Sequence, residues 1–152
     1  MRPSEEPLPA GSLADRVLVE KSKRLLTLFR EDRPLKQYPI SLGGDPLGHK
    51  VQEGDSRTPE GHYLIDFHKA NSGYYRALHI SYPNPADTDA ARARGVAPGG
   101  AIMIHGIRNG LGWIGPLHRL LDWTAGCIAL TDRQMQELWE AIPDGTPIEI
   151  RP

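Results

Sequence analysis

Apolar and polar residues alternate over short stretches in much of the chain, a period of two that is typical of β-strands with one buried face. Val17 and Val19, then Leu26 and Leu28, flank a basic turn at residues 21–24, so this part of the chain predicts a β-hairpin. The other predicted strands lie at residues 35–42, 62–67, 77–81 and 101–105 and around Ile148 and Ile150.

A helical period of hydrophobic positions is clearest over residues 132–142. The positions i, i+3, i+4 and i+7 are apolar there, which predicts one buried helical stripe; they are Met135, Leu138, Trp139 and Ile142. Thr131 and Gln134 have the spacing of a capping box at its start. A shorter helix is predicted over residues 86–94, with Gly95 as its stop. Another is predicted to begin at Pro116, with three leucines on one face: Leu117, Leu120 and Leu121.

Glycine and proline are abundant, with 16 glycines and 14 prolines among 152 residues. Both interrupt helix interiors, so this composition excludes a helical bundle and favours many short strands and turns. Residues 48–61 are predicted to form a long loop, and residues 1–12 a flexible leader rich in proline. We therefore expect one mainly β domain with short helices over residues 13–152, which is long enough to form its own core.

The charge balance argues against an extended nucleic-acid interface. The chain has 18 basic and 19 acidic residues and a net charge of −1, without the basic surplus that binds a phosphate backbone. No apolar run approaches the roughly 20 residues that cross a bilayer, and the N-terminus lacks the hydrophobic core of a signal peptide. The single cysteine excludes an internal disulfide and a four-cysteine zinc site. No two histidines have i, i+4 spacing within a predicted helix, so we expect no metal site.

The single cysteine, Cys127, follows a turn of small residues and precedes a short apolar segment. Gly126 allows a carbonyl group to approach the sulfur and lets backbone N–H groups point at it, as an oxyanion hole requires. The predicted strand at residues 101–105 ends at His105, whose imidazole is suited to take a thiol proton. A lone cysteine is more often a small buried hydrophobe, so a structural core cysteine is the competing interpretation.

These residues resemble the signature of the L,D-transpeptidase catalytic domain of the YkuD type. In that family a His-Gly pair precedes a Ser/Thr-x-Gly-Cys-Ile/Val segment. Here His105-Gly106 precedes residues 124–128, which read Thr-Ala-Gly-Cys-Ile. Residues 58–61, Thr-Pro-Glu-Gly, are similar to the family's Thr-Pro-x-Gly element. Together with the N-terminal hairpin, the resemblance covers about residues 13–151.

The resemblance implies an L,D-transpeptidase-type β-sandwich that acts on peptidoglycan stem peptides without a cofactor. Cys127 would attack the diaminopimelate carbonyl of a tetrapeptide and expel the terminal D-Ala, with His105 as general base. Backbone amides near Gly126 and Cys127 would hold the oxyanion, while Thr124 and Gly106 would support the site. An amine of a second stem would then resolve the thioester. The resemblance also implies a periplasmic or wall-facing location and a role in cell-wall biogenesis and cell shape.

Two positions depart from the common family pattern. Many members have His after the Ser/Thr and Arg two residues after the Cys, where this chain has Ala125 and Ala129. The missing guanidinium removes a fixed positive charge beside the sulfur. The Thr-x-Gly-Cys-Ile-Ala form is similar to a subgroup that includes peptide hydrolases. A hydrolase of the same family, either an L,D-carboxypeptidase or an amidase, therefore stays open, as does a catalytically silent wall-binding module.

Other side chains are secondary candidates. His118 is the alternative base, although its polar neighbours predict an exposed helix face. His79 is a candidate for the substrate groove, and Arg108 for a substrate carboxylate, which a guanidinium binds in a bidentate manner. Trp113 and Trp123 flank the segment that joins the two catalytic candidates. They are expected to pack against the sheet or to wall the groove and exclude water.

Overall fold

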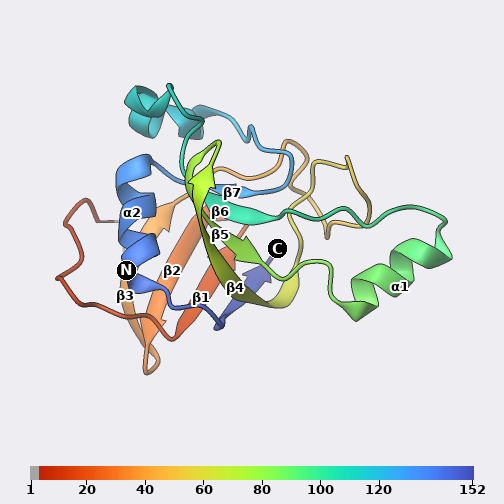
Figure 1. The fold of residues 1–152 in the computed structure, drawn as a ribbon, viewed down its shortest axis with the longest axis horizontal. Helices are drawn as coiled ribbons and strands as arrows, with labels where there is room; N and C mark the ends of the chain where they lie inside the picture. Colours follow the sequence, from red (N-terminus) through yellow and green to blue (C-terminus); the bar gives the residue numbers. More distant parts are fainter. Residues whose placement is uncertain (1–3) are drawn as a thin grey trace.

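The computed structural model describes residues 4–152 and shows a mainly β domain (Figure 1). Its elements, in chain order, are β1 (Arg16–Glu20), β2 (Leu25–Arg30), β3 (Arg33–Pro39), β4 (Gly61–Ser72), β5 (Tyr75–Ile80), α1 (Pro85–Ala93), β6 (Met103–His105), η1 (Gly112–Leu120), β7 (Ile128–Ala129), α2 (Asp132–Ala141) and β8 (Thr146–Arg151). The mainly β class with short helices is confirmed. Residues 1–3 of the predicted leader lie outside the described residues.

The eight strands form one mixed, curled sheet, a half-barrel in the order β3-β2-β1-β8-β4-β5-β6-β7. The predicted N-terminal hairpin is confirmed, because β1 and β2 pair antiparallel from Arg16 and Phe29 to Glu20 and Leu25. The C-terminal strand β8 lies in the middle of the sheet, parallel to β1 and antiparallel to β4. The sandwich-like arrangement expected from the sequence is thus one continuous sheet that curls on itself.

The bounds of β4 and β6 differ from those that the alternation predicts. β4 continues to Ser72, past the predicted end at residue 67, because two register irregularities let its polar second half keep pairing with β5. β6 begins at Met103 instead of residue 101, since Ala101 has a φ of 52°, which a strand does not allow. The result is a long β4–β5 hairpin, and its strand β5 pairs with β6, the neighbour of the edge strand β7.

The third strand ends at Pro39, where the sequence predicts residue 42, and the chain then makes two isolated bridges to the segment around the cysteine. Ser41 pairs with Ala129 and Gly43 pairs with Thr124. A Cβ on Gly43 would overlap the backbone carbonyl of Ser56, so only glycine fits at this approach. These bridges attach the cysteine segment to the N-terminal half of the chain.

The two α-helices agree with their predictions. Thr131 caps α2 by accepting a hydrogen bond from the Gln134 N–H at 3.3 Å, and Met135 and Leu138 of the predicted stripe are fully buried. Only this half of the predicted capping box forms, because Gln134 Oε1 accepts no hydrogen bond within the described residues. Gly95 follows α1 with a φ of 72°, as expected for a helix stop. The two helices lie at opposite ends of the longest axis of the domain (Figure 1).

The helix predicted at Pro116 belongs to the 3₁₀ segment η1, which is interrupted at Gly115 by a φ of 55°. Its three leucines are largely exposed: Leu117 by 62%, Leu120 by 78% and Leu121 by 73%. η1 lies beyond the edge of the sheet (teal in Figure 1), so these side chains do not reach the core.

The core joins one face of the sheet to the apolar stripe of α2. Leu8 packs against this core, and its N–H donates to Glu137 Oε1 at 2.9 Å. The same carboxylate accepts hydrogen bonds from Lys36 Nζ at 2.9 Å and from the Tyr38 hydroxyl at 3.4 Å. The Glu137 side chain therefore links α2, β3 and the segment before β1.

Candidate active site

A tight turn held by Thr124 presents Cys127 at the start of β7. Thr124 Oγ1 accepts a hydrogen bond from the Gly126 N–H at 3.1 Å and donates one to the Cys127 carbonyl at 2.7 Å. Gly126 has a φ of 132°, and a Cβ there would lie 2.7 Å from the Arg57 carbonyl oxygen. Both the backbone angle and the available space therefore require glycine, so the Thr-x-Gly-Cys pattern shapes the backbone around the sulfur.

The Cys127 thiol is partly buried and makes two weak hydrogen bonds to backbone. It donates to the Ala101 carbonyl and accepts from the Met103 N–H, both at 3.4 Å. Burial raises the pKa of the thiol, while the Met103 N–H and the charge of Lys50 offset part of that rise. The resting cysteine is therefore a protonated thiol at neutral pH.

His105 ends β6 and is held as a neutral imidazole. Its Nδ1 lies 2.6 Å from the Gly106 carbonyl oxygen. A carbonyl only accepts, so Nδ1 carries the proton and Nε2 is left as a proton acceptor. His105 is only 5% exposed, and this burial lowers the pKa of its imidazole, although the hydrogen bond to Gly106 opposes the shift. The site thus contains an unprotonated base and a protonated thiol.

The parallel pairing of β6 and β7 sets the positions of these two side chains. Ile104 pairs with Ile128, and His105 pairs with Ala129. The two isoleucines belong to the core, so the flanking Cys127 and His105 lie on the opposite face of the sheet, as diagonal neighbours. Both line one cavity of about 430 Å³. The structure therefore brings together the nucleophile and the base that the sequence predicts.

Two aromatic rings cover the imidazole. The Tyr74 ring lies 4.6 Å from the His105 ring, and the Trp123 ring lies 5.7 Å from it, measured between centroids. Tyr74 comes from the turn of the β4–β5 hairpin, and its carbonyl accepts a hydrogen bond from the Gly106 N–H at 2.9 Å. The other residues that line the cavity are Lys69, Ser72, Gly73, Ala77, Ala101, Met103, Thr124 and Ala125. The rings limit the access of water to the base.

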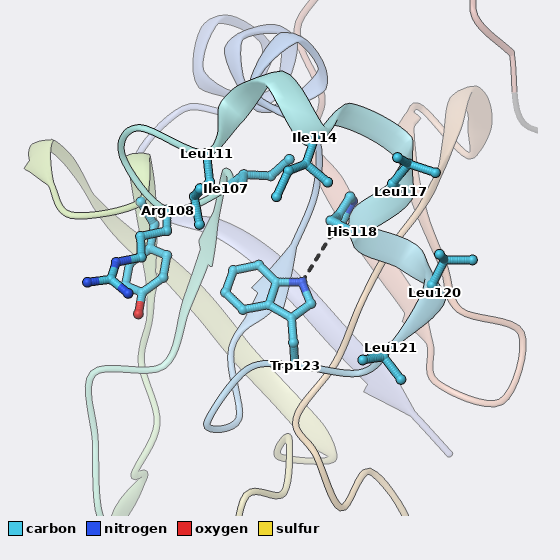
Figure 2. Close-up of a pocket in the computed structure, with 10 residues that line it drawn as sticks. Ile107, Arg108, Leu111, Ile114, Leu117, His118, Leu120, Leu121 and Trp123 are labelled. Carbon is cyan, nitrogen blue, oxygen red and sulfur yellow. Dashed lines mark hydrogen bonds between the residues drawn. The ribbon is translucent and has the colours of Figure 1, made fainter.

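A second cavity, of about 470 Å³, shares Tyr74 and Trp123 with the first one (Figure 2). Figure 2 shows the Trp123 indole in its centre, with Nε1 directed at His118. The remaining lining residues are mostly apolar: Ile107, Arg108, Leu111, Ile114, Leu117, Leu120 and Leu121. The Trp123 ring is therefore a common wall of the two cavities.

The structure corrects the prediction that His118 is exposed, because the 3₁₀ turn directs this side chain inward. Its Nδ1 accepts a hydrogen bond from Trp123 Nε1 at 3.3 Å. Burial, followed by the charge of Arg119, lowers its pKa to about 4. His118 does not line the cavity that contains Cys127, and its contacts assign it to the positioning of Trp123.

Three predicted substrate-binding residues do not line the cavity that contains Cys127. His79 lies on β5, with Nδ1 2.6 Å from Asp66 Oδ1 and its ring stacked on Phe67 at 4.4 Å. Arg108 lines the apolar cavity (Figure 2). Trp113 is 79% exposed and lines neither cavity, so the prediction that it packs against the sheet is wrong. It belongs to η1, which projects away from the sheet.

Tyr74 and Asp132 also support the site, and the sequence pattern does not predict either of them. Asp132 Oδ1 accepts a hydrogen bond from the Ile107 N–H at 2.8 Å, which fixes the chain just after His105. A Cβ on Gly106 would lie 2.5 Å from the same oxygen, so the glycine of the His-Gly pair has a steric reason. Asp132 lies in the first turn of α2, shortly after the cysteine, and this position could have indicated that its side chain lies near the site.

The shifted pKa values predict how the reactivity of Cys127 depends on pH. Burial destabilises the thiolate, so the thiol keeps its proton to higher pH than a free cysteine. Alkylation of native Cys127 by iodoacetamide should be slower at pH 7 than alkylation of the urea-unfolded chain, and its rate should still be rising at pH 9. The measurement is the rate of mass increase between pH 5 and pH 10. A rate that is already constant below pH 7 would instead indicate a thiolate–imidazolium pair.

Within residues 4–152, no cluster of three or more His, Cys, Asp or Glu side chains is arranged to hold a metal ion. No helix in this part of the chain is both long and apolar enough to cross a bilayer.

The thiol, imidazole and glycine turn lie together on this sheet, and comparison with known proteins gives the family of the chain. The family model of the L,D-transpeptidase catalytic domain, YkuD, matches residues 14–150. The chain belongs to this family, whose members act on peptidoglycan.

Two relatives show how far the similarity extends. The curated protein named "Putative L,D-transpeptidase YafK" of Escherichia coli strain K12 is 29% identical over 132 residues, which are 83% of this chain and 46% of that protein. The crystal structure of the helical cell shape determining protein Pgp2 from Campylobacter jejuni has a TM-score of 0.69 at 25% identity, over 97% of this chain and 51% of that chain. This chain thus spans about half the length of these relatives.

The fold is also that of the LD transpeptidase LdtMt1, whose structure is known in complex with imipenem. The TM-score is 0.58 at 18% identity, over 89% of this chain and 57% of that chain.

Proposed function

We propose that this protein is a cysteine-dependent L,D-transpeptidase that acts on peptidoglycan stem peptides at the cell wall. The observation that carries the proposal is that Cys127, just before β7, and a neutral His105, at the end of the neighbouring strand β6, line one cavity. The bond from His105 Nδ1 to the Gly106 carbonyl leaves Nε2 free to accept a proton. Membership of the L,D-transpeptidase family supports the choice of substrate class.

In the proposed reaction, Cys127 attacks the carbonyl of the third stem residue, diaminopimelate, in a tetrapeptide. His105 Nε2 takes the thiol proton as the C–S bond forms, and it returns that proton to the amine of D-Ala as the C–N bond breaks. The products of this half-reaction are a thioester on Cys127 and free D-Ala. The amine of a second stem then attacks the thioester and restores the thiol.

The backbone amide of Cys127 is the proposed oxyanion donor. The Gly126 N–H is already bonded to Thr124 Oγ1, whereas no acceptor for the Cys127 N–H is found in the described chain. Donors that are fixed before the reaction stabilise a developing oxyanion without reorganisation. Thr124, which bonds to both sides of this peptide, is then the residue that holds the amide in place.

Acylation by a carbapenem tests the nucleophile. The fold is shared with an LD transpeptidase whose structure is known in complex with imipenem. We therefore expect that incubation with imipenem raises the intact mass of the wild-type chain by one imipenem adduct and leaves Cys127→Ala unchanged. An unmodified wild-type chain that also resists iodoacetamide in the native state would contradict the proposal and favour a structural cysteine.

The products with a tetrapeptide stem then separate a transferase from a hydrolase. A transpeptidase releases D-Ala and forms a cross-linked dimer, which a second peptide supplied as the amine acceptor should increase. Release of D-Ala with tripeptide as the other product, and no dimer, would assign the same site to an L,D-carboxypeptidase that uses water.

A further inference from the structure

The cavity that contains Cys127 is lined by a single side chain with a permanent charge, and that charge is positive. Among its lining residues, Lys69 is the only Lys, Arg, Asp or Glu. The imidazole of His105 is neutral at pH 7, as derived above. Any charged group that binds in this cavity therefore meets one cation and no anion, which selects an anionic partner such as a carboxylate.

The sheet register aligns Lys69 with the proposed base. Lys69 pairs with Ala77, and Ala77 pairs with His105, so the three residues form one row across β4, β5 and β6. Paired residues share a face of the sheet, and neighbouring strands are about 4.8 Å apart, so the Lys69 and His105 backbones are about 10 Å apart. Ala77 lies between them and carries only a methyl group, so no large side chain of β5 separates Lys69 from His105.

Lys69 makes no ion pair in the described chain, unlike the three buried lysines of the protein. Lys21 pairs with Glu60, Lys36 with Glu137 and Lys50 with Asp55. Those three cations are neutralised within the protein. The exposed ammonium of Lys69 is available to a ligand in the cavity.

We propose that the Lys69 ammonium binds the C-terminal carboxylate of the amino acid that the reaction expels. This inference rests on the proposed function. The leaving nitrogen must lie at His105, which returns its proton, and the carboxylate belongs to the same residue. A hydrogen bond of about 3 Å at each end, with about 3 Å between the nitrogen and the carboxylate oxygen, spans about 9 Å. The proposal therefore requires about 9 Å between His105 Nε2 and Lys69 Nζ, and these two side chains project from the same face of the sheet.

The same row has its positive charge, Lys69, at the β4 end and not at the β7 end. On the other side of His105 the row ends at Ala129, the position where many family members have Arg. In this chain that end is uncharged and buried, and the charge lies at the opposite end, beyond Ala77. Lys69 thus makes the site selective for a donor peptide that ends in a free acid just after the bond that is cleaved.

The test compares two donors that differ only in this group, the tetrapeptide stem with a free C-terminal carboxylate and the same peptide with a C-terminal carboxamide. We expect wild-type kcat/KM to favour the acid by about 10- to 100-fold, the range of one charge-assisted hydrogen bond. Lys69→Met should lose this preference, because its kcat/KM should fall for the peptide with the carboxylate and not for the peptide with the carboxamide. Lys69→Arg should keep most of the preference. An equal loss on both peptides, or a preference that only Arg108→Met abolishes, would overturn the assignment.

A second measurement keeps this inference separate from the proposed function. Iodoacetate carries a carboxylate and iodoacetamide does not, and both alkylate Cys127 without turnover of a peptide. The rate of alkylation by iodoacetate divided by the rate of alkylation by iodoacetamide should be several-fold lower in Lys69→Met than in the wild type. In Lys69→Arg this ratio should stay close to the wild-type value. If neither peptide is cleaved, the proposed function fails and this ratio alone decides on Lys69. A ratio that is the same in all three proteins would show that no anion is bound there.

Discussion

Replacement of His105 by Gln should lower the rate of Cys127 acylation by about 10²- to 10⁴-fold, the usual contribution of a general base. The glutamine amide can still donate a hydrogen bond to the Gly106 carbonyl, so the local backbone should be preserved. It cannot accept the thiol proton. Because burial already favours the protonated thiol, loss of the base leaves very little thiolate at neutral pH.

The measurement is the rate at which imipenem acylates the protein, followed by intact mass at pH 7, and the matched control is His118→Gln. His118 is also buried, but it contacts Trp123 and lies in the wall of the neighbouring cavity. We expect this control to change the rate by much less than His105→Gln does. If His118→Gln proved the more damaging of the two, the role of base would pass to His118.

Removal of the Glu137 carboxylate should cause a large loss in the free energy of unfolding, because this side chain pairs with a buried lysine and accepts two further hydrogen bonds. Glu137→Leu leaves the Lys36 ammonium buried, with only the Glu6 carbonyl as an acceptor. Breaking a buried ion pair from one side costs about 3–5 kcal/mol, because the remaining charge is not solvated. The Leu8 N–H and the Tyr38 hydroxyl lose an acceptor at the same time.

Urea unfolding at pH 7 checks this expectation, with the Lys36→Met/Glu137→Leu double variant as control. The double variant removes both charges and should recover most of the stability lost in Glu137→Leu. If the double variant were as unstable as Glu137→Leu, the loss would stem from packing or from Leu8 and Tyr38, and not from the stranded ammonium.

The sequence predicted well those parts of the fold that local pattern controls. The hairpin of β1 and β2 and the helix α2 have the expected positions, because their apolar periods and caps are encoded within a few residues. β4 is longer than predicted because its extension depends on pairing with β5 and on two irregularities, neither of which leaves an apolar alternation.

Within the candidate site, the sequence identified the side chains with reactive groups and missed those that act through position. Cys127 and His105 carry their chemistry in their residue type. Tyr74 and Lys69 contribute only because the β4–β5 hairpin brings them to the cavity. His118 was misjudged because its polar neighbours suggested an exposed helix face, whereas the interruption at Gly115 changes the direction of the turn.

The bridges from Ser41 and Gly43 to the segment around Cys127 affect the order in which the protein folds. The turn that shapes the thiol pairs with residues about eighty positions earlier in the chain, and β8, the last strand made, lies in the middle of the sheet. Such distant contacts form late in folding. The surroundings of Cys127 are therefore complete only when nearly the whole domain is assembled. A nascent or partly unfolded chain carries the cysteine without the turn and the base that surround it in the folded domain, so acylation by imipenem also counts the fraction of molecules that are fully folded.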